Sequence, residues 1–381
     1  MTPMANSDLL LQNINDEQPF PIAFADLEQA AQQKLAAGPF GYIRSGAGHE
    51  QTLRNNRTAF EKYSIVPRFL QDVSKLDTSI KLFGKTFPTP LLFAPVGMNG
   101  MVHEDGELAV VRAAAKLNMP YIQSTVSTYS LEDVAKAAPN NTRLFQLYWS
   151  ANEAVSYSMA ERAESAGFDA IVLTIDTVML GWRTEDVRNQ FSPLKEGFAR
   201  GNYMQDPAFN AALKDDSFET YVASVIENVY HPHITWAHIK ELKKRTSLPI
   251  YLKGILHPED AALALEHGVN GIIVSNHGGR QLDGVVGSLD ALPGIAEVIA
   301  GRIPIILDSG IYSGIDVLKA LALGADAVAI GRPFVYGLAL DGQQGVETVM
   351  RNIYEEFKVS LALAGATNIQ AARKLTLVKN G

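Results

Sequence analysis

Residues 271–276 read Gly-Ile-Ile-Val-Ser-Asn, and the chain continues directly into His277-Gly278-Gly279-Arg280-Gln281. The first part is a short apolar and β-branched run, which is typical of a buried strand. The second part is a glycine-rich turn that carries a histidine and an arginine. Strands that end in polar turns and alternate with helices indicate a parallel sheet wrapped by helices.

From about residue 90 onward, runs of this kind alternate with longer segments of helical periodicity. Eight β–α units in one chain favour a closed (β/α)8 TIM barrel over an open sheet. The eight runs are Leu91–Pro95, Tyr121–Ser124, Leu144–Tyr148, Ala170–Asp176, Pro249–Lys253, Gly271–Asn276, Pro304–Asp308 and Ala327–Gly331.

We expect residues 1–381 to form a single domain on this barrel. An N-terminal helical extension covers about 1–88, the barrel about 89–345 and a C-terminal helical tail about 346–381. After the fourth strand, residues 184–233 break the β–α rhythm with a long stretch of mixed character. Long excursions of this kind are commonly lids or binding loops.

Composition excludes several classes of protein. The net charge of −8 disfavours nucleic acid as a partner, because no basic surplus exists to release counterions. No apolar stretch is long enough to span a membrane, and Met1–Phe20 does not resemble a signal peptide, so we expect a cytoplasmic protein. The chain has no cysteine, which excludes thiol nucleophiles and Cys-ligated metals, so redox chemistry requires a bound cofactor.

Polar residues follow nearly every predicted strand. In a TIM barrel the carboxyl ends of the strands form the active-site face. Each of these residues could instead cap the next helix, but their recurrence at one end of the barrel indicates a site. They are Ser124, Gln146, Tyr148, Thr174, Asp176, Lys253, Asn276, His277 and Asp308.

The turn after the sixth strand combines two complementary groups. The imidazole of His277 can take a proton near neutral pH, and the guanidinium of Arg280 can hold a carboxylate through two hydrogen bonds. Asp308-Ser309-Gly310 and Gly331-Arg332-Pro333 follow the seventh and eighth strands. Barrels bind phosphate at this place through backbone amides and a cation, so we expect a phosphorylated ligand.

With these motifs the chain resembles the FMN-dependent L-2-hydroxy-acid oxidase family, which includes glycolate oxidase, lactate oxidase and lactate monooxygenase. The resemblance covers about Phe24 to Leu377, and the Ser275–Gln281 run is its most specific part. Phe145-Gln146-Leu147-Tyr148, Leu252-Lys253-Gly254-Ile255 and Gly331-Arg332-Pro333 occur in the family's order.

The resemblance implies roles for residues of this chain. His277 would be the base, Asp176 would stabilise the imidazolium, and Lys253 would lie near the flavin N1 and O2 atoms. The residues implied in substrate binding are Tyr42, Tyr148, Arg183, Arg280 and Tyr203. Those implied in FMN binding are Pro95, Val96, Gly97, Ser124, Gln146, Thr174, Lys253, Ser275, Asp308, Gly310, Gly331 and Arg332.

The implied reaction is hydride transfer from a small L-2-hydroxy acid, most simply L-lactate, to FMN, with O2 as electron acceptor. Gly97, Val126, the triplet 181–183 and residues 202–207 look more like lactate monooxygenases, which yield acetate, CO2 and water. The alternative is an L-lactate oxidase that releases pyruvate and hydrogen peroxide. Relatives imply a homo-oligomer, a tetramer or octamer.

Other readings of the chain are weaker. A nicotinamide enzyme would need a Gly-x-Gly-x-x-Gly turn, and an IMP dehydrogenase would need a catalytic cysteine; neither is present. His231, His233 and His238 crowd together, but no nearby carboxylate completes a ligand set, so we expect no metal site. One departure concerns the phosphate: the family usually has arginine where this chain has Tyr312, which predicts looser FMN retention.

Overall fold

A closed barrel of eight parallel strands is the centre of the computed structural model, which describes residues 20–380. The strand order follows the sequence from β4 to β11, and β11 pairs with β4 to close the ring. The predicted (β/α)8 barrel is therefore confirmed. The strands are β4 (Leu91–Phe93), β5 (Tyr121–Ser124), β6 (Arg143–Tyr148), β7 (Ala170–Thr174), β8 (Ile250–Ile255), β9 (Gly271–Val274), β10 (Ile305–Leu307) and β11 (Ala327–Ile330).

The barrel strands are mostly apolar and almost entirely buried. Every residue of β7 and β9 is buried, because one face fills the barrel and the other packs under the surrounding helices. The polar residues predicted at the strand ends therefore stand out from an apolar core. The stretch Met1–Phe20, considered above as a possible signal, lies outside the described residues apart from Phe20.

Eight helices surround the barrel. The last of them, α16, contains a break at Asp341 and Gly342, and it packs against α2, α5 and α15. It thereby joins the end of the barrel to its beginning. The helices are α5 (Gly106–Leu117), α6 (Leu131–Ala137), α7 (Glu153–Ser165), α12 (Trp236–Arg245), α13 (Pro258–Glu266), α14 (Ser288–Ile299), α15 (Gly314–Ala322) and α16 (Arg332–Leu363).

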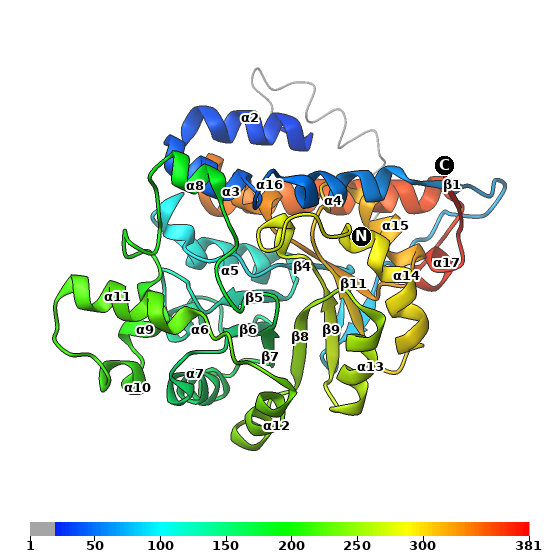
Figure 1. Cartoon of the computed structure of the whole chain (residues 1–381). Helices are drawn as coiled ribbons and strands as arrows, with labels where there is room; N and C mark the ends of the chain where they lie inside the picture. Colours follow the sequence, from blue (N-terminus) through cyan, green and yellow to red (C-terminus); the bar gives the residue numbers. More distant parts are fainter. Residues whose placement is uncertain (1–19, 381) are drawn as a thin grey trace.

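The excursion after the fourth barrel strand, β7, contains four helices. The last three form the green lobe at the left of Figure 1, whereas the first lies at the top beside the N-terminal helices. Asn202 ties it to the barrel: its amide donates to the carbonyl oxygens of Ser124 (3.1 Å) and Thr125 (2.9 Å) and accepts from the amide of Leu131 (2.8 Å). The helices of the excursion are α8 (Thr184–Arg188), α9 (Arg200–Met204), α10 (Pro207–Asn210) and α11 (Phe218–Val229).

The N-terminal helices α2 (Phe24–Lys34), α3 (Ala37–Arg44) and α4 (Gln51–Glu61) run along the top of Figure 1 beside α16. The loop between α3 and α4 reaches the turn after β9, where the amide of Ala47 donates to the carbonyl of Gly279 at 2.8 Å. This loop therefore covers the end of the barrel at which the polar residues gather.

Two small sheets and short helical turns complete the chain. From the sequence we expect the N-terminal extension and the C-terminal tail to be separate additions to the barrel. In the structure, β1 and β12 pair antiparallel and join these two segments. Among residues 20–380, no helix combines the length and the apolar character needed to cross a bilayer. The remaining elements are β1 (Tyr63–Val66), β2 (Ile80–Leu82), β3 (Lys85–Phe87), β12 (Thr376–Lys379), α17 (Ile369–Ala372) and the 3-10 turns Asn99–Met101 and His277–Gly279.

Candidate active site

A cavity opens at the carboxyl ends of the barrel strands, and most of the predicted site residues line it. They arrive from seven of the eight strand ends, from α3 and from the start of the excursion. The predicted residues in its wall are Tyr42, Pro95, Val96, Gly97, Ser124, Tyr148, Arg183, Lys253, His277, Arg280, Asp308, Gly310, Gly331 and Arg332.

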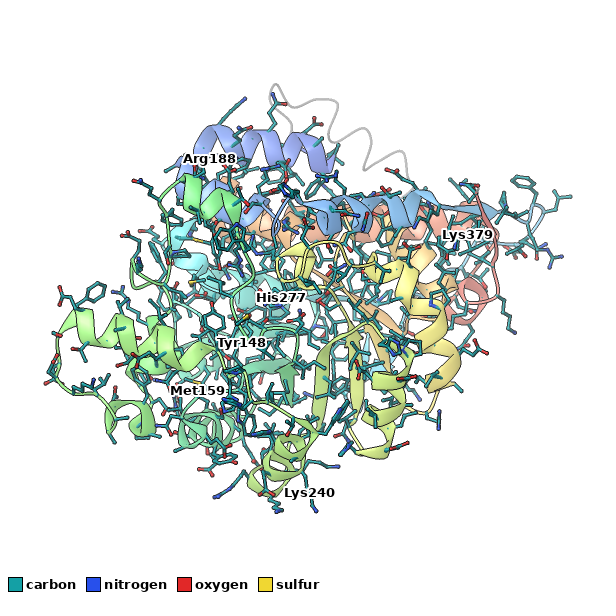
Figure 2. All side chains as sticks on the ribbon, viewed as in Figure 1. Tyr148, Met159, Arg188, Lys240, His277 and Lys379 are labelled. Atoms are coloured by element: carbon teal, nitrogen blue, oxygen red, sulfur yellow. The ribbon has the colours of Figure 1, made fainter. Side chains whose placement is uncertain are left out.

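His277 and Asp176 form a hydrogen-bonded pair at the wall of this cavity. The Nδ1–H of His277 donates to Oδ1 of Asp176 at 2.7 Å, and the Thr177 hydroxyl donates to the same oxygen at 2.8 Å. The Nε2 atom of His277 lies 3.4 Å from the hydroxyl of Tyr148. Both labelled side chains lie near the centre of the molecule in Figure 2. A lone pair on Nε2 can therefore accept a proton from a molecule in the cavity.

The protonation states of this pair suit a base. Burial lowers the pKa of His277, and Lys253 lowers it further, while Asp176 partly offsets both. Burial alone would raise the pKa of Asp176, but His277, Lys253 and two hydrogen bonds bring it to about 2. At neutral pH the imidazole is therefore neutral and the carboxylate behind it is ionised.

The backbone holds His277 in an uncommon conformation. Its φ is +60°, in the left-handed region that non-glycine residues rarely adopt. The hydroxyl of Ser275 accepts from the His277 amide at 3.0 Å, and the hydroxyl of Ser309 accepts from the Gly278 amide at 2.9 Å. Gly254 is equally constrained, since a Cβ there would lie 2.7 Å from Cβ of Asp176.

Two buried guanidinium groups face the same cavity from the side of Tyr42. The Arg280 Cζ lies 4.5 Å from the centre of the Tyr42 ring, and the Arg183 Cζ lies 5.3 Å from it. Nη2 of Arg280 and Nε of Arg183 are buried and have no hydrogen-bond partner. Burial, with Arg183 nearby, lowers the pKa of Arg280 to about 10, so the group stays positive at neutral pH. Unpaired donors on buried cations call for an anionic ligand such as a carboxylate.

Lys253 is a third buried cation. Its ammonium donates to the Ser275 hydroxyl at 3.0 Å and lies 3.4 Å from the Asp308 carboxylate. Only 4% of the residue is exposed, and it lines the cavity. A lysine at this depth is positioned to stabilise negative charge on a ring bound beside it.

Three predicted FMN ligands lie behind the cavity wall rather than in it. The side-chain amide of Gln146 donates to the Thr174 hydroxyl at 3.0 Å and accepts from the Ser124 hydroxyl at 3.2 Å. Ser275 accepts from Lys253. These residues hold the lining side chains Ser124 and Lys253 in place.

The end of the cavity at β10 and β11 fits a phosphate. The side chain of Arg332 lies at the amino end of the long helix α16, where the helix dipole favours an anion. A Cβ at Gly331 would make only ordinary van der Waals contact, 3.7 Å from Cγ2 of Val96. Buried cations, a phosphate-binding helix end and a cavity between them suit FMN. Bound there, FMN would contact Lys253 and Arg332.

Tyr312, which replaces the family's arginine, is part of an aromatic and cationic cluster that the sequence did not predict. Its ring stacks on Phe24 with 3.6 Å between centres, and the Cζ of Arg57 lies 4.7 Å from its centre. Arg57 also forms an ion pair with Asp316 at 2.8 Å. A guanidinium group from α4 therefore stands near the position where the expected arginine is missing.

Tyr203 does not reach the cavity. It is 1% exposed, its ring packs on Phe209 at 5.0 Å, and it is not among the residues that line the two cavities described. A contact between Tyr203 and substrate would require α9 to move.

The sequence analysis assigned no role to two residues that hold the site together. Thr177 directly follows Asp176 and donates to it, and Ser309, inside the Asp308–Gly310 turn, accepts from the Gly278 amide.

A second, larger cavity lies under the excursion and adjoins the first. Tyr230, which follows α11, lines only the second. The two cavities share part of their walls, so the polar site lies next to the space under the excursion. The residues common to both walls are Tyr42, Met98, Val126, Tyr148 and Arg183.

Comparison with known proteins gives consistent similarities. The family model described as FMN-dependent dehydrogenase matches residues 31–379. The chain is 74% identical to an L-lactate oxidase of Lysinibacillus sphaericus, over 100% of this chain and 98% of that protein. It is 42% identical to human 2-hydroxyacid oxidase 1, over 94% and 97%. A crystal structure of mandelate oxidase with (S)-4-hydroxymandelic acid superposes with a TM-score of 0.86 at 39% identity, over 94% and 99%.

Proposed function

Because the chain belongs to the FMN-dependent dehydrogenase family, we propose that it is an L-lactate oxidase that converts L-lactate and O2 into pyruvate and hydrogen peroxide. FMN is its cofactor, and FMN-dependent oxidation of 2-hydroxy acids is its chemistry. The identity of the acid and the fate of oxygen are the parts proposed.

One observation carries the proposed chemistry: an acceptor nitrogen and two buried cations face one cavity. The Nε2 atom of His277 faces the cavity, and the unpartnered donors of Arg280 and Arg183 are buried beside it. A 2-hydroxy acid carries a carboxylate and a hydroxyl on adjacent carbons. The arginines would bind the carboxylate, which brings the hydroxyl to the imidazole.

In the proposed mechanism His277 removes the hydroxyl proton through Nε2, and Asp176 stabilises the imidazolium that forms. Bound FMN supplies the ring that accepts the hydrogen of the substrate Cα with its two electrons. Arg280 and Arg183 hold the carboxylate throughout, while Tyr148 orients the hydroxyl. The substrate thus loses two hydrogens and leaves as the 2-oxo acid.

The 74% identical L-lactate oxidase supports the oxidase outcome, the alternative above, over the monooxygenase outcome that the sequence features favoured. The structure also weakens the argument from Gly97 and Val126, two of the residues that favoured the monooxygenase outcome. A Cβ at Gly97 would lie 2.6 Å from Cγ2 of Val126 and 2.9 Å from its carbonyl oxygen. A side chain at 97 would therefore crowd both the side chain and the backbone of Val126, so Gly97 and Val126 pack together and are not two independent indications.

The adjacency of the two cavities also supports early release of pyruvate. Monooxygenase turnover needs pyruvate to stay in a closed site while oxygen reacts. Here the wall residues of the polar site also border the larger space under the excursion. We therefore expect pyruvate to leave the site before peroxide can decarboxylate it.

The products of aerobic L-lactate turnover, measured without catalase, test the proposal. We expect one pyruvate and one hydrogen peroxide for each L-lactate consumed. Acetate and CO2 as main products would refute the oxidase outcome and leave FMN-dependent hydroxy-acid oxidation intact. Anaerobic L-lactate should bleach the flavin absorbance; a flavin that L-lactate does not reduce would refute the substrate.

We also propose a homo-oligomer. Five large apolar side chains, two of which line the second cavity, are between 49% and 73% exposed, and single scattered residues of this kind are more usual on monomers. These five side chains are Met179, Leu180, Trp182, Leu282 and Val286. A monomeric mass in light scattering would contradict the proposed homo-oligomer.

A further inference from the structure

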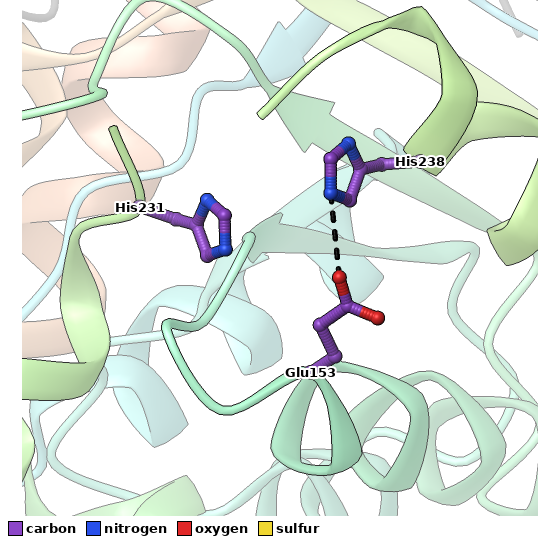
Figure 3. Close-up of side chains that lie close together, drawn as sticks. All are labelled: Glu153, His231 and His238. Atoms are coloured by element: carbon purple, nitrogen blue, oxygen red, sulfur yellow. Dashed lines mark ion pairs between the residues drawn. The ribbon is translucent and has the colours of Figure 1, made fainter. Parts of the chain in front are cut away.

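Outside the active site, the side chains of Glu153, His231 and His238 converge on one space. One ligand atom from each lies within 4.8 Å of the other two. Figure 3 shows both imidazole rings turned toward the carboxylate, with an ion pair of 3.3 Å between Nε2 of His238 and Oε1 of Glu153. We propose that these three residues form a binding site for a divalent transition-metal ion of the zinc class.

The three ligands come from different elements, which is why the sequence did not predict the set. Glu153 begins α7, His231 follows α11, and His238 lies in the first turn of α12. The expectation that no nearby carboxylate completes the histidine cluster was wrong, because Glu153 is distant in sequence but adjacent in space.

The ligand chemistry selects the metal. Two imidazoles and one carboxylate are typical of zinc and its neighbours, whereas Mg²⁺ and Ca²⁺ prefer oxygen ligands. Zinc with bonds of about 2.1 Å holds its ligand atoms about 3.4 Å apart, so the His238–Glu153 pair already has the required spacing. His231 is half-buried and has to move inward by a small side-chain rotation.

Metal binding requires the protons of the His231 and His238 imidazoles to be rearranged, which lowers the affinity. The Nδ1 atoms of His238 and His231 accept from the amides of Thr235 (2.9 Å) and His233 (3.1 Å), so Nε2 carries the proton in the metal-free protein. To free Nε2 for a metal, the proton of each ring has to move to Nδ1, which breaks the hydrogen bond from the Thr235 or His233 amide. For His238 the Thr235 hydroxyl, 3.1 Å from Nδ1, can then accept the proton. We therefore expect an affinity in the micromolar range, weaker than that of a structural zinc site.

The surroundings otherwise favour a bound cation. The Tyr157 hydroxyl donates to the other oxygen of Glu153 at 3.0 Å and orients the carboxylate.

The position of the three ligands indicates what a bound ion would do to the excursion. His231 is at the trailing end of the excursion, and its neighbour Tyr230 lines the second cavity. A bound ion would tie this end of the excursion to α7 and α12. Because none of the three ligands lines the polar cavity, the ion would restrain a wall of the second cavity without contacting substrate.

Isothermal titration of Zn²⁺ into untagged, chelator-treated holoenzyme tests the site. We expect one ion per chain in wild type, and binding at least about tenfold weaker in His231→Ala, His238→Ala and Glu153→Gln. His233→Ala is the matched control: its ring lies 5.9 Å from that of His231, but it is not one of the three ligands. It should bind Zn²⁺ as wild type does, and Mg²⁺ should not bind.

Limited proteolysis within residues 184–233 gives a second readout. Zn²⁺ should slow cleavage in wild type and in His233→Ala but not in His231→Ala. No Zn²⁺ binding to wild type, unchanged affinity in all three ligand variants, or an equal loss in His233→Ala would overturn the proposal. All ligand side chains are partly exposed, so folding of the variants can be verified by thermal unfolding.

Discussion

The Nδ1 atom of His277 lies 2.7 Å from Oδ1 of Asp176, while the other carboxylate oxygen is buried without a hydrogen-bond partner. The Asp176 carboxylate therefore accepts side-chain hydrogen bonds from two residues, Thr177 and His277. This arrangement fixes the tautomer of His277 and leaves Nε2 as the proton acceptor. It also places a negative charge where the positive charge of the imidazolium will develop.

Replacing His277 by Gln should leave FMN bound but lower the rate of flavin reduction by L-lactate at least about a hundredfold, because the amide cannot accept the hydroxyl proton. Anaerobic stopped-flow absorbance measures this rate. The FMN content of the purified variant is the control. A decrease below tenfold would remove His277 from the role of base.

The pH dependence follows from the lowered pKa of His277. Since burial favours the neutral ring, kcat/KM for L-lactate should stay level above the ordinary histidine pKa of about 6.5 and fall only at more acidic pH. Asp176→Asn removes the charge that raises the pKa of His277. Its acid limb should shift to lower pH and its plateau should fall. An acid limb above pH 6.5 in wild type would contradict this assignment.

Thr177 is expected to be a positioning residue. Its hydroxyl donates to Asp176 at 2.8 Å and lies 3.2 Å from Nδ1 of His277. Thr177→Val should lower flavin reduction about three- to tenfold, as expected for one lost hydrogen bond, and should shift the acid limb. Thr177→Ser keeps the hydroxyl and should restore both. If Val and Ser variants behave alike, the hydroxyl has no such role.

The sequence predicted the barrel and its site for a physical reason. Parallel strands buried on both faces read as apolar runs, so polar residues at their ends stand out. Contacts between distant segments leave no such signal. The stack of Tyr312 on Phe24 and the approach of Glu153 to His231 depend on how helices pack, which no local pattern records.

Arg280→Lys should raise KM for L-lactate more than it lowers kcat. The Arg280 guanidinium donates to the carbonyl of Ser45 at 2.7 Å and keeps Nη2 free for the cavity. A lysine cannot make both interactions with one planar group. Arg188→Lys is a suitable control, because Arg188 is exposed on α8. Steady-state constants equal to those of wild type would refute the carboxylate clamp.

The substitution Tyr312→Arg should affect FMN binding and apoprotein stability in opposite directions. An arginine there should add a charge-assisted hydrogen bond to the phosphate and tighten FMN binding by up to about tenfold. The same change removes the stack on Phe24 and brings a second guanidinium toward Arg57, so the thermal stability of the apoprotein should fall. Equilibrium dialysis of apoprotein against FMN and thermal unfolding measure the two effects.

Tyr312→Phe is the control for this pair of effects, because it retains the aromatic stack and adds no charge. It should change neither FMN affinity nor apoprotein stability by much. Equal or weaker FMN binding by Tyr312→Arg would mean that Arg332, with Arg57 behind the Tyr312 ring, already neutralises the phosphate. In that case Arg57→Gln, with its unfolding midpoint checked because Asp316 loses its partner, should weaken FMN binding severalfold.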